Sequence, residues 1–479
     1  MSKPIPSVPF LEGNFRPWSL EGDVHDVSVK GEIPRELNGA YYRNGPNPQF
    51  APRGRYHWFD GDGMIHGFFF ENGRCDYRNR WVQTERFLRE REAGESLLGG
   101  LADMAAGAPE AEGLNSNAAN TNIVWHGGKL LALWEAGPPT ELDPVSLETR
   151  GLWQFDGELT RQIDPALAGN EDGIVPGIMT AHPKMDPDSG EMHFFGYSPI
   201  PPYLTYRVAD RDGRLIRSEE IDVPFASMMH DFIVTDAHVI FPVFPGVFDL
   251  ELIEKTGTAL GWQPERGSHI GVMPRDGGNA DVVWVQADPC YVFHPMNAHS
   301  EGDRVIAEVA RYPKLPLFGV EGAEAATLYR WTIDLASGTL KEEPLDDCPT
   351  EFPRLDERFA GKPYRHGYAG GGVRSMASTD EFNADPIFDS VLHYDLQTGS
   401  RRTHTLPVGD AVGEPVFVPR SADAEEGDGF VLALAYRGAE NRSDLLVLDA
   451  QNIEAEPLAT VQLPHRVPFG FHGNWRQGQ

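Results

Sequence analysis

The chain is short of cysteine, of positive charge and of long apolar runs, and each shortage excludes a class of protein. Its three cysteines, Cys75, Cys290 and Cys348, are widely spaced and form no CxxC pair, so neither a zinc-binding motif nor a disulfide framework is indicated. Lys and Arg number 41 against 72 Asp and Glu, a formal net charge of −31. A nucleic-acid-binding protein needs the opposite sign to neutralise phosphate, so we expect no nucleic-acid partner.

Membrane-spanning and secreted classes are also disfavoured by what is missing. No apolar run approaches the roughly 18 residues that a spanning helix needs. The first residues, MSKPIPSVPFLEG, lack the apolar segment of a secretory signal. We therefore expect a cytoplasmic location. The acidity disfavours anionic membranes by charge alone, although an apolar patch could still dock at the membrane surface.

Glycine and proline, by contrast, are plentiful: 51 Gly and 39 Pro are spread along the whole chain. This is typical of short strands joined by turns rather than of helices. Gly127-Gly128, between two apolar runs, predicts a tight hairpin. The clearest strand-like runs are 122–135, 238–243, 282–286, 304–312 and 429–438.

A recurring sequence unit indicates the architecture of the fold. An apolar residue and an Asp precede a turn, and another strand often follows, at 141–149, 184–195, 332–342, 393–406 and 446–463. The copies are irregularly spaced, unlike a tidy repeat. Such units over hundreds of residues favour an all-β propeller, with two sandwiches of ordinary hairpins as the alternative. No linker divides the chain, so we expect one domain over 1–479.

Two segments depart from this strand pattern. Residues 84–107 mix charge with apolar residues and predict a helical insertion with an apolar face, which either covers an entrance or is an ordinary surface helix. Residues 241–255 form a second apolar stretch, broken by prolines.

Among 16 histidines, four stand beside apolar residues at the edges of strand-like runs. They are His182 in IMTAHPKMD, His230 in SMMHDFIVTD, His294 in YVFHPMNAH and His472 in VPFGFHGNW. No short metal-binding motif occurs, so a metal site would have to gather single histidines from distant segments, as a propeller axis can. Taken alone, each could be an ordinary core histidine, and the residues themselves indicate no more than a buried histidine cluster.

These four segments resemble the carotenoid cleavage oxygenase family, which includes bacterial apocarotenoid- and stilbene-cleaving oxygenases. The resemblance begins at GEIPRELNGAYYRNGPNPQF (31–50) and HWFDGDGMIHGFFF (57–70) and ends at VPFGFHGNW (467–475). It implies a seven-bladed β-propeller with a helical or loop cap over its top face, contributed by an insertion at about 84–115.

The resemblance also implies a metal centre. Fe(II) would be held by His182, His230, His294 and His472, with O2 as co-substrate. In the third motif the ligand matches His294, three residues before Asn297, and not His299. The family's three glutamates behind the ligands match Glu135, Glu351 and Glu414. Such carboxylates fix an imidazole by accepting its second N–H, and they offset the charge of the metal.

The implied reaction is oxidative cleavage of a C=C bond to two carbonyl products. Relatives that cleave stilbenes or phenylpropenoids carry a Lys before the first glutamate, and the stilbene cleavers add a Tyr in the preceding insertion. Here that position is Trp134, and no Tyr lies between Trp81 and Trp153. We therefore expect a carotenoid or apocarotenoid substrate in an apolar tunnel lined by Phe59, Trp134, Phe293 and Phe471.

Two alternatives remain open at this stage. One is cleavage of a stilbene or phenylpropenoid at the same iron, and the other is a non-catalytic propeller that serves as a binding platform. Because a polyene partitions into membranes, the apolar residues of 84–107 and 241–255 could contact a bilayer interface. The sequence indicates neither the oligomeric state nor the bond that is cleaved.

Overall fold

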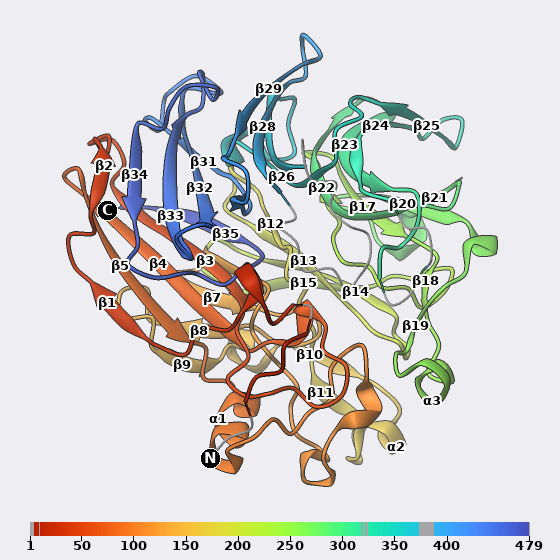
Figure 1. The fold of residues 1–479 in the computed structure, drawn as a ribbon. Helices are drawn as coiled ribbons and strands as arrows, with labels where there is room; N and C mark the ends of the chain where they lie inside the picture. The colour runs from red at the N-terminus through yellow and green to blue at the C-terminus, as the bar shows by residue number, and fades with distance from the viewer. Residues whose placement is uncertain (1–3, 9, 318–319, 321–323, 373–387, 479) are drawn as a thin grey trace.

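Seven antiparallel sheets surround a central axis in the computed structural model, which describes residues 4–8, 10–317, 320, 324–372 and 388–478 (Figure 1). The seven-bladed β-propeller expected above is confirmed. The first three blades, in sheet order, are β1 (Gly22–Val24), β5 (Arg74–Trp81), β4 (Gly63–Glu71), β3 (Gly39–Pro46) and β35 (Gly473–Gln477); β6 (Asn122–His126), β7 (Lys129–Leu133), β8 (Thr140–Leu142) and β9 (Thr149–Leu152); and β12 (Lys184–Met185), β13 (Met192–Tyr197), β14 (Leu204–Ala209) and β15 (Leu215–Glu220).

The remaining four blades follow in chain order. They are β16 (Ile233–Val234), β17 (His238–Val243), β20 (Ser268–Pro274) and β21 (Val283–Ala287); β22 (Tyr291–Glu301), β23 (Arg304–Tyr312), β24 (Thr327–Asp334) and β25 (Thr339–Pro344); β26 (Thr350–Leu355), β27 (His366–Gly371), β28 (Ser390–Asp395) and β29 (Ser400–Thr405); and β30 (Ala411–Val412) and β31 (Val416–Pro419), both paired to β32 (Gly429–Arg437), then β33 (Arg442–Asp449), β34 (Ala459–Gln462) and β2 (Val29–Gly31).

The strand predictions hold where the sequence pattern is strongest. The runs 238–243 and 304–312 coincide with β17 and β23, and 282–286 lies within one residue of β21. In the predicted hairpin, Gly127 and Gly128 have φ of 56° and 74° and join β6 to β7. This is the left-handed conformation that a two-residue hairpin turn requires and that glycine adopts without strain.

The ring is closed by strands from both ends of the chain. The C-terminal strand β35 joins the first blade, where Gly39 of β3 pairs with Gln477. Near the N-terminus, β2 joins the last blade, where Val29 pairs with Val461 of β34. Blades one and seven therefore each depend on a strand from the far end of the sequence.

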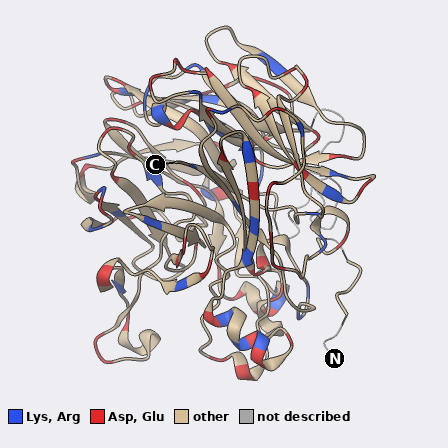
Figure 2. Ribbon diagram, turned by 90° about the vertical axis from the view of Figure 1, so that its left-hand side faces the viewer, with Lys and Arg blue, Asp and Glu red and all other residues tan. Residues whose placement is uncertain are grey.

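Apolar side chains fill the spaces between blades. The largest core cluster joins the third, fourth and fifth blades and includes Phe195, Tyr206, Phe241, Tyr291 and Trp331, all fully buried. Charged residues of both signs are interspersed over the ribbon (Figure 2). Among the described residues, no helix is both long and apolar enough to cross a bilayer.

Among the described residues, three α-helices lie along the lower part of the molecule in Figure 1. They are α1 (Glu85–Ala93), α2 (Pro165–Ala168) and α3 (Leu252–Thr256), accompanied by the two-stranded sheets β10 (Thr160–Gln162) with β11 (Ile174–Pro176) and β18 (Gly246–Phe248) with β19 (Leu260–Trp262). Short 3-10 turns complete the described elements: Gly13–Phe15, Trp58–Asp60, Met104–Ala106, Pro109–Ala111, Phe155–Gly157, Pro264–Arg266, Asn279–Asp281 and Glu357–Phe359.

The helix expected over 84–107 is much shorter than predicted. Thr84 caps its N-terminus by accepting the Phe87 N–H, but Gly94 at φ 75° ends it after nine residues. A glycine in the left-handed conformation is a common helix stop. The rest of the segment is loop with 3-10 turns, in which Leu101 and Met104 are exposed, and within the helix Leu88 is exposed while Phe87 is buried.

The apolar stretch 241–255 is largely unavailable to a membrane. Phe241 and Val243 belong to the central strand β17, and Phe244 and Val247 are also buried in the core. Only Leu250 is a large exposed apolar residue there. The expectation that this stretch presents an apolar surface is therefore corrected, because its alternation of Pro and Phe encodes a buried strand and a turn.

Closure of the ring gives a first prediction. A methyl group at Gly39 would meet the Arg476 carbonyl oxygen at 2.3 Å, and φ there is 153°. Gly39→Ala should therefore lower the free energy of unfolding by about 1–3 kcal/mol, measured as a lower melting temperature. Gly22→Ala is the control, since nothing lies within 4 Å of its added methyl group. Equal melting temperatures for the two variants would contradict this role of the closing strand.

Candidate metal centre

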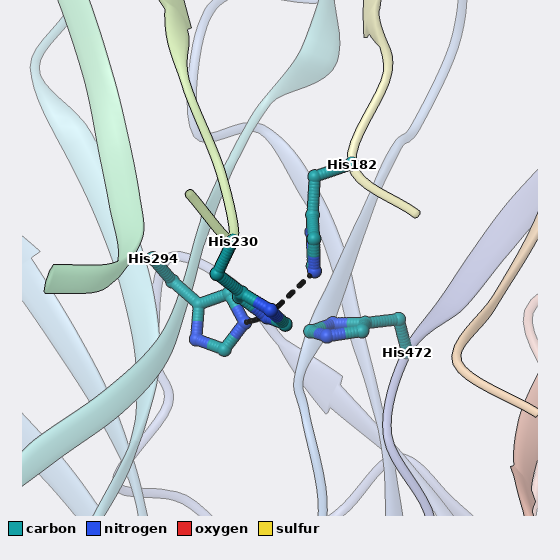
Figure 3. Close-up of side chains that lie close together, drawn as sticks. All are labelled: His182, His230, His294 and His472. Carbon is teal, nitrogen blue, oxygen red and sulfur yellow. Dashed lines mark hydrogen bonds between the residues drawn. The ribbon is translucent and has the colours of Figure 1, made fainter. Parts of the chain in front are cut away.

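Four histidines converge at the propeller axis (Figure 3). His182 and His230 lie just before β12 and β16, His294 lies within β22, and His472 directly precedes β35. These are inner-edge strands of the third, fourth, fifth and first blades. All four side chains are buried. The cluster expected from the sequence is thus present, assembled from four blades.

A bulge in β22 aims two consecutive side chains at the centre. The pairing of β22 with β23 shifts register around Pro295, which has no N–H to give to the ladder. Such bulges re-aim side chains at functional sites. Here Phe293 and His294 line the same cavity although they are adjacent in the strand.

Three of the imidazoles are held by the three expected glutamates. The Nδ1 atoms lie within hydrogen-bond distance of carboxylate oxygens: 2.5 Å from His230 to Glu135, 2.6 Å from His294 to Glu351, and 2.8 Å from His472 to Glu414. Because an ionised carboxylate can only accept, each Nδ1 carries the proton. In the neutral imidazoles, each Nε2 atom then carries a lone pair that can bind a metal. At His230 burial lowers the pKa, but the Glu135 carboxylate outweighs this effect and raises it.

The distances between the Nε2 atoms are shorter than expected for two neutral imidazoles that have no proton between them. His230 Nε2 lies 3.0 Å from His182 Nε2 and 3.2 Å from His294 Nε2. With protons on Nδ1 alone, His230 and His294 have only acceptors at that contact, so they repel unless a proton or a metal cation lies between them. Two nitrogens each about 2.1 Å from one ion are about 3.0 Å apart at a right angle and about 3.4 Å apart in a tetrahedron.

The 3.0 Å distance matches a right angle, and the 3.2 Å distance lies between the two geometries. Four imidazoles suit iron among other first-row metals and would leave positions open on a six-coordinate ion. Burial lowers the pKa of His472 to about 4 although Glu414 opposes the shift. Burial and the neighbouring imidazoles also hold the pKa of His182 well below its usual range. Both side chains are thus neutral ligands at physiological pH.

The carboxylate behind His472 belongs to a larger network that the sequence did not reveal. Burial would raise the pKa of Glu414, but Arg354 at 3.1 Å and His472 bring it down to about 2. The Gly473 N–H donates to the same carboxylate at 2.8 Å. Arg354 and Glu414 come from distant segments with no shared motif, so only the fold shows that they meet.

The fourth imidazole is held differently. His182 Nδ1 lies 3.8 Å from Asp231 Oδ2, beyond hydrogen-bond distance, and Asp231 is paired with Lys184 at 2.8 Å. In the sequence, the position of Asp231 directly after His230 was the one sign that Asp231 lies near the cluster. His182 is therefore the least restrained member of the cluster.

Two cavities of opposite character meet at the cluster. One, about 220 Å³, has mostly aromatic and aliphatic walls. The other, about 520 Å³, has charged walls that include Lys184, Asp231 and Arg354. His294 and His472 line both, whereas His230 lines only the apolar cavity and His182 only the polar one. The cluster thus sits at the boundary between an apolar and a polar chamber.

All four residues expected to form the tunnel walls line the apolar cavity: Phe59, Trp134, Phe293 and Phe471. The sequence missed Phe352, whose ring centroid lies 5.4 Å from that of His294 and 5.1 Å from that of His472. Phe352 has φ of 50°, a conformation that costs a bulky residue free energy and that clusters at functional sites. His299 lies outside the cluster, 3.4 Å from Glu301.

Comparison with known proteins agrees with this geometry. The model of the retinal pigment epithelial membrane protein family matches residues 15–477. The chain belongs to this family of carotenoid cleavage oxygenases. The resemblance stated from the motifs is therefore confirmed. It is a family of non-haem iron oxygenases, and the buried four-histidine cluster can hold such a metal.

Individual relatives cover the full length of the chain. Isoeugenol monooxygenase of Pseudomonas nitroreducens is 37% identical over 98% of both chains. The crystal structure of a lignostilbene dioxygenase of Pseudomonas brassicacearum superposes with a TM-score of 0.91 at 34% identity over 100% of both chains. A cobalt-substituted apocarotenoid oxygenase of Synechocystis gives 0.83 at 30% identity, over 96% of this chain and 97% of that one.

The cluster predicts which histidines control metal content. His294→Ala removes a nitrogen from the axis, so the purified protein should lose its stoichiometric iron. His299→Ala should retain it, since that imidazole lies outside the cluster. Metal analysis of anaerobically prepared protein decides the matter, and iron lost equally from both variants would contradict the assignment.

The carboxylates predict a graded effect on metal affinity. Glu414→Gln keeps a hydrogen-bond acceptor for His472 but removes the charge, and we expect metal affinity to fall about 10- to 100-fold. Glu357→Gln is the control, because Glu357 also pairs with Arg354 but is exposed. Chelator competition measures both variants, and equal affinities would show that the buried charge does not act on the metal.

Proposed function

We propose that the protein is a non-haem Fe(II)-dependent oxygenase that cleaves the C=C bond of a small aryl-alkene, a phenylpropenoid or stilbene, to two carbonyl products. His182, His230, His294 and His472 would hold the iron, and Glu135, Glu351 and Glu414 would orient three of them. When bound, iron would supply the redox chemistry that allows O2 to react with the alkene.

The size of the apolar cavity carries the choice of substrate. Pockets for drug-sized ligands measure about 300–1,000 Å³, and this one measures about 220 Å³. Such a space suits one or two aromatic rings better than a long polyene. The rings of Trp134, Phe293 and Phe352 could stack on an aryl group and hold its alkene beside the histidines. This reverses the order of substrates favoured from the sequence.

The names of the relatives support the same preference for an aryl-alkene over a polyene. Isoeugenol monooxygenase and lignostilbene dioxygenase are named for aryl-alkene substrates, and both match the chain over nearly its whole length. A carotenoid or apocarotenoid remains the second candidate. It is favoured by Trp134 in the position before Glu135 and by the half-exposed Leu101 in the cavity wall.

The chain's residues need to bind, orient and exclude water rather than transfer protons. The aromatic walls keep bulk water from the alkene, and the carboxylates aim the imidazoles, while burial keeps His472 neutral. The convergence of four buried imidazoles beside an apolar cavity supports a metal-dependent enzyme over a non-catalytic binding platform.

Product analysis tests the proposal. Iron-loaded protein is incubated in air with a 4-hydroxyphenylpropene, a hydroxystilbene and an apocarotenal, and O2 uptake and aldehydes are measured. We expect aromatic aldehyde formation coupled to O2 uptake, with none in His294→Ala. Cleavage of the apocarotenal alone would transfer the assignment to the second candidate, and no turnover by iron-replete protein would refute an oxygenase of either kind.

A further inference from the structure

Phe352 lies at the boundary between the apolar and the polar cavity. Among the residues that the structure describes, the two cavities share only His294, Phe352 and His472. The phenyl ring is therefore placed at the level of the histidine cluster. Metal binding explains why the two imidazoles are there, but it does not explain the phenyl ring.

Strand β26 passes from one cavity to the other at this residue. Glu351 lines only the apolar cavity, Phe352 lines both, and Arg354 lines only the polar cavity. Strand β22 makes the same passage at His294, and the segment that leads into β35 makes it at His472. Phe352 thus takes the position in β26 that a histidine of the cluster takes in β22.

The polar cavity is accessible to bulk solvent. Its lining includes Asp188 and Glu357, whose side chains are 76% and 56% exposed, as well as the buried His182. Water that enters between those carboxylates can approach the histidines. Exclusion of water from a reacting group strengthens its interactions with the protein and prevents side reactions. An alkene in the apolar cavity therefore needs a barrier on this side.

The Phe352 ring is held where such a barrier has to lie. It packs edge-on against His472, with centroids 5.1 Å apart and planes at 83°, and against Phe388, at 5.7 Å and 69°. Its N–H donates at 2.6 Å to the Glu351 oxygen that also accepts from His294 Nδ1. The carboxylate that aims a histidine therefore also holds Phe352 in its left-handed conformation, with φ of 50°.

We propose that Phe352 is the partition between the two cavities, and that its ring keeps solvent in the polar cavity away from an aryl-alkene bound in the apolar one. Phe352 acts as a barrier and takes no part in making or breaking bonds. The inference rests on the proposed function, because it concerns an alkene beside the histidines. Truncation of the ring would join a cavity of about 220 Å³ to one of about 520 Å³.

Solvent access to a bound ligand tests the partition. A hydroxystilbene is fluorescent, so its quenching by acrylamide, a neutral water-soluble quencher, is followed with the ligand bound to iron-loaded protein in the absence of O2. We expect weak quenching in the wild type and several-fold stronger quenching in Phe352→Ala, because acrylamide reaches the ligand through the polar cavity. Phe352→Leu keeps a smaller barrier, should give an intermediate value, and serves if the alanine variant does not fold.

Phe388→Ala is the matched control. Phe388 is also a buried phenylalanine that lines the apolar cavity, and it packs against Phe352, but it is not among the described residues that line the polar cavity. Its truncation removes the same number of atoms without breaching the boundary, so quenching should remain at the wild-type level. Iron content and the Kd of the ligand are measured for each variant, so that loss of the cluster or of binding is recognised.

The outcomes separate the partition from the proposed function, because the quenching needs no turnover. Equal quenching in Phe352→Ala and Phe388→Ala, or quenching in the wild type as strong as that of the free stilbene, would overturn the inference. A wild type that binds no hydroxystilbene would also overturn it. If Phe352 shields the ligand but the protein cleaves no alkene in air, the proposed function fails while the partition stands.

Discussion

The metal centre depends on one electrostatic constraint. Three imidazoles donate their Nδ1 protons to buried carboxylates, so their Nε2 lone pairs face the axis. Each bond joins different blades. His294 of the fifth blade bonds Glu351 of the sixth, and His230, before the fourth, bonds Glu135, which follows a strand of the second. The lone pairs can converge only when the ring is closed, so folding and metal binding are linked.

Ring closure therefore matters to the chemistry as well as to stability. His472 directly precedes β35, the strand that completes the first blade, and its partner Glu414 lies between β30 and β31 of the last. Glu414 is in turn held by Arg354 of the sixth blade. One buried charge network thus spans the junction at which the chain's two ends meet, and any opening of that junction would separate an imidazole from its carboxylate.

The sequence predicted some levels of this structure better than others. Strands with strong β pattern, such as β17 and β23, and the hairpin at Gly127-Gly128 were readable because local chemistry fixes them. His182, His230, His294 and His472 were found only through motif resemblance, since nothing local marks a core histidine as a ligand. Arg354 and Phe352 were missed because their roles arise from contacts between blades. The helix expected over 84–107 was overextended because its apolar residues were read as one face across Gly94.

Substrate choice shows why a motif can mislead when it is read without its surroundings. The change from Lys to Trp134 before Glu135 suggested an apolar tunnel, because it removes a polar partner from one wall. The opposite wall carries Glu351 and Phe352 on a single bulged strand, β26, where the left-handed φ of Phe352 places its ring against His294 and His472. Both residues line the apolar cavity beside the histidines. The small volume of that cavity, about 220 Å³, is what supports the proposed aryl-alkene over a long polyene.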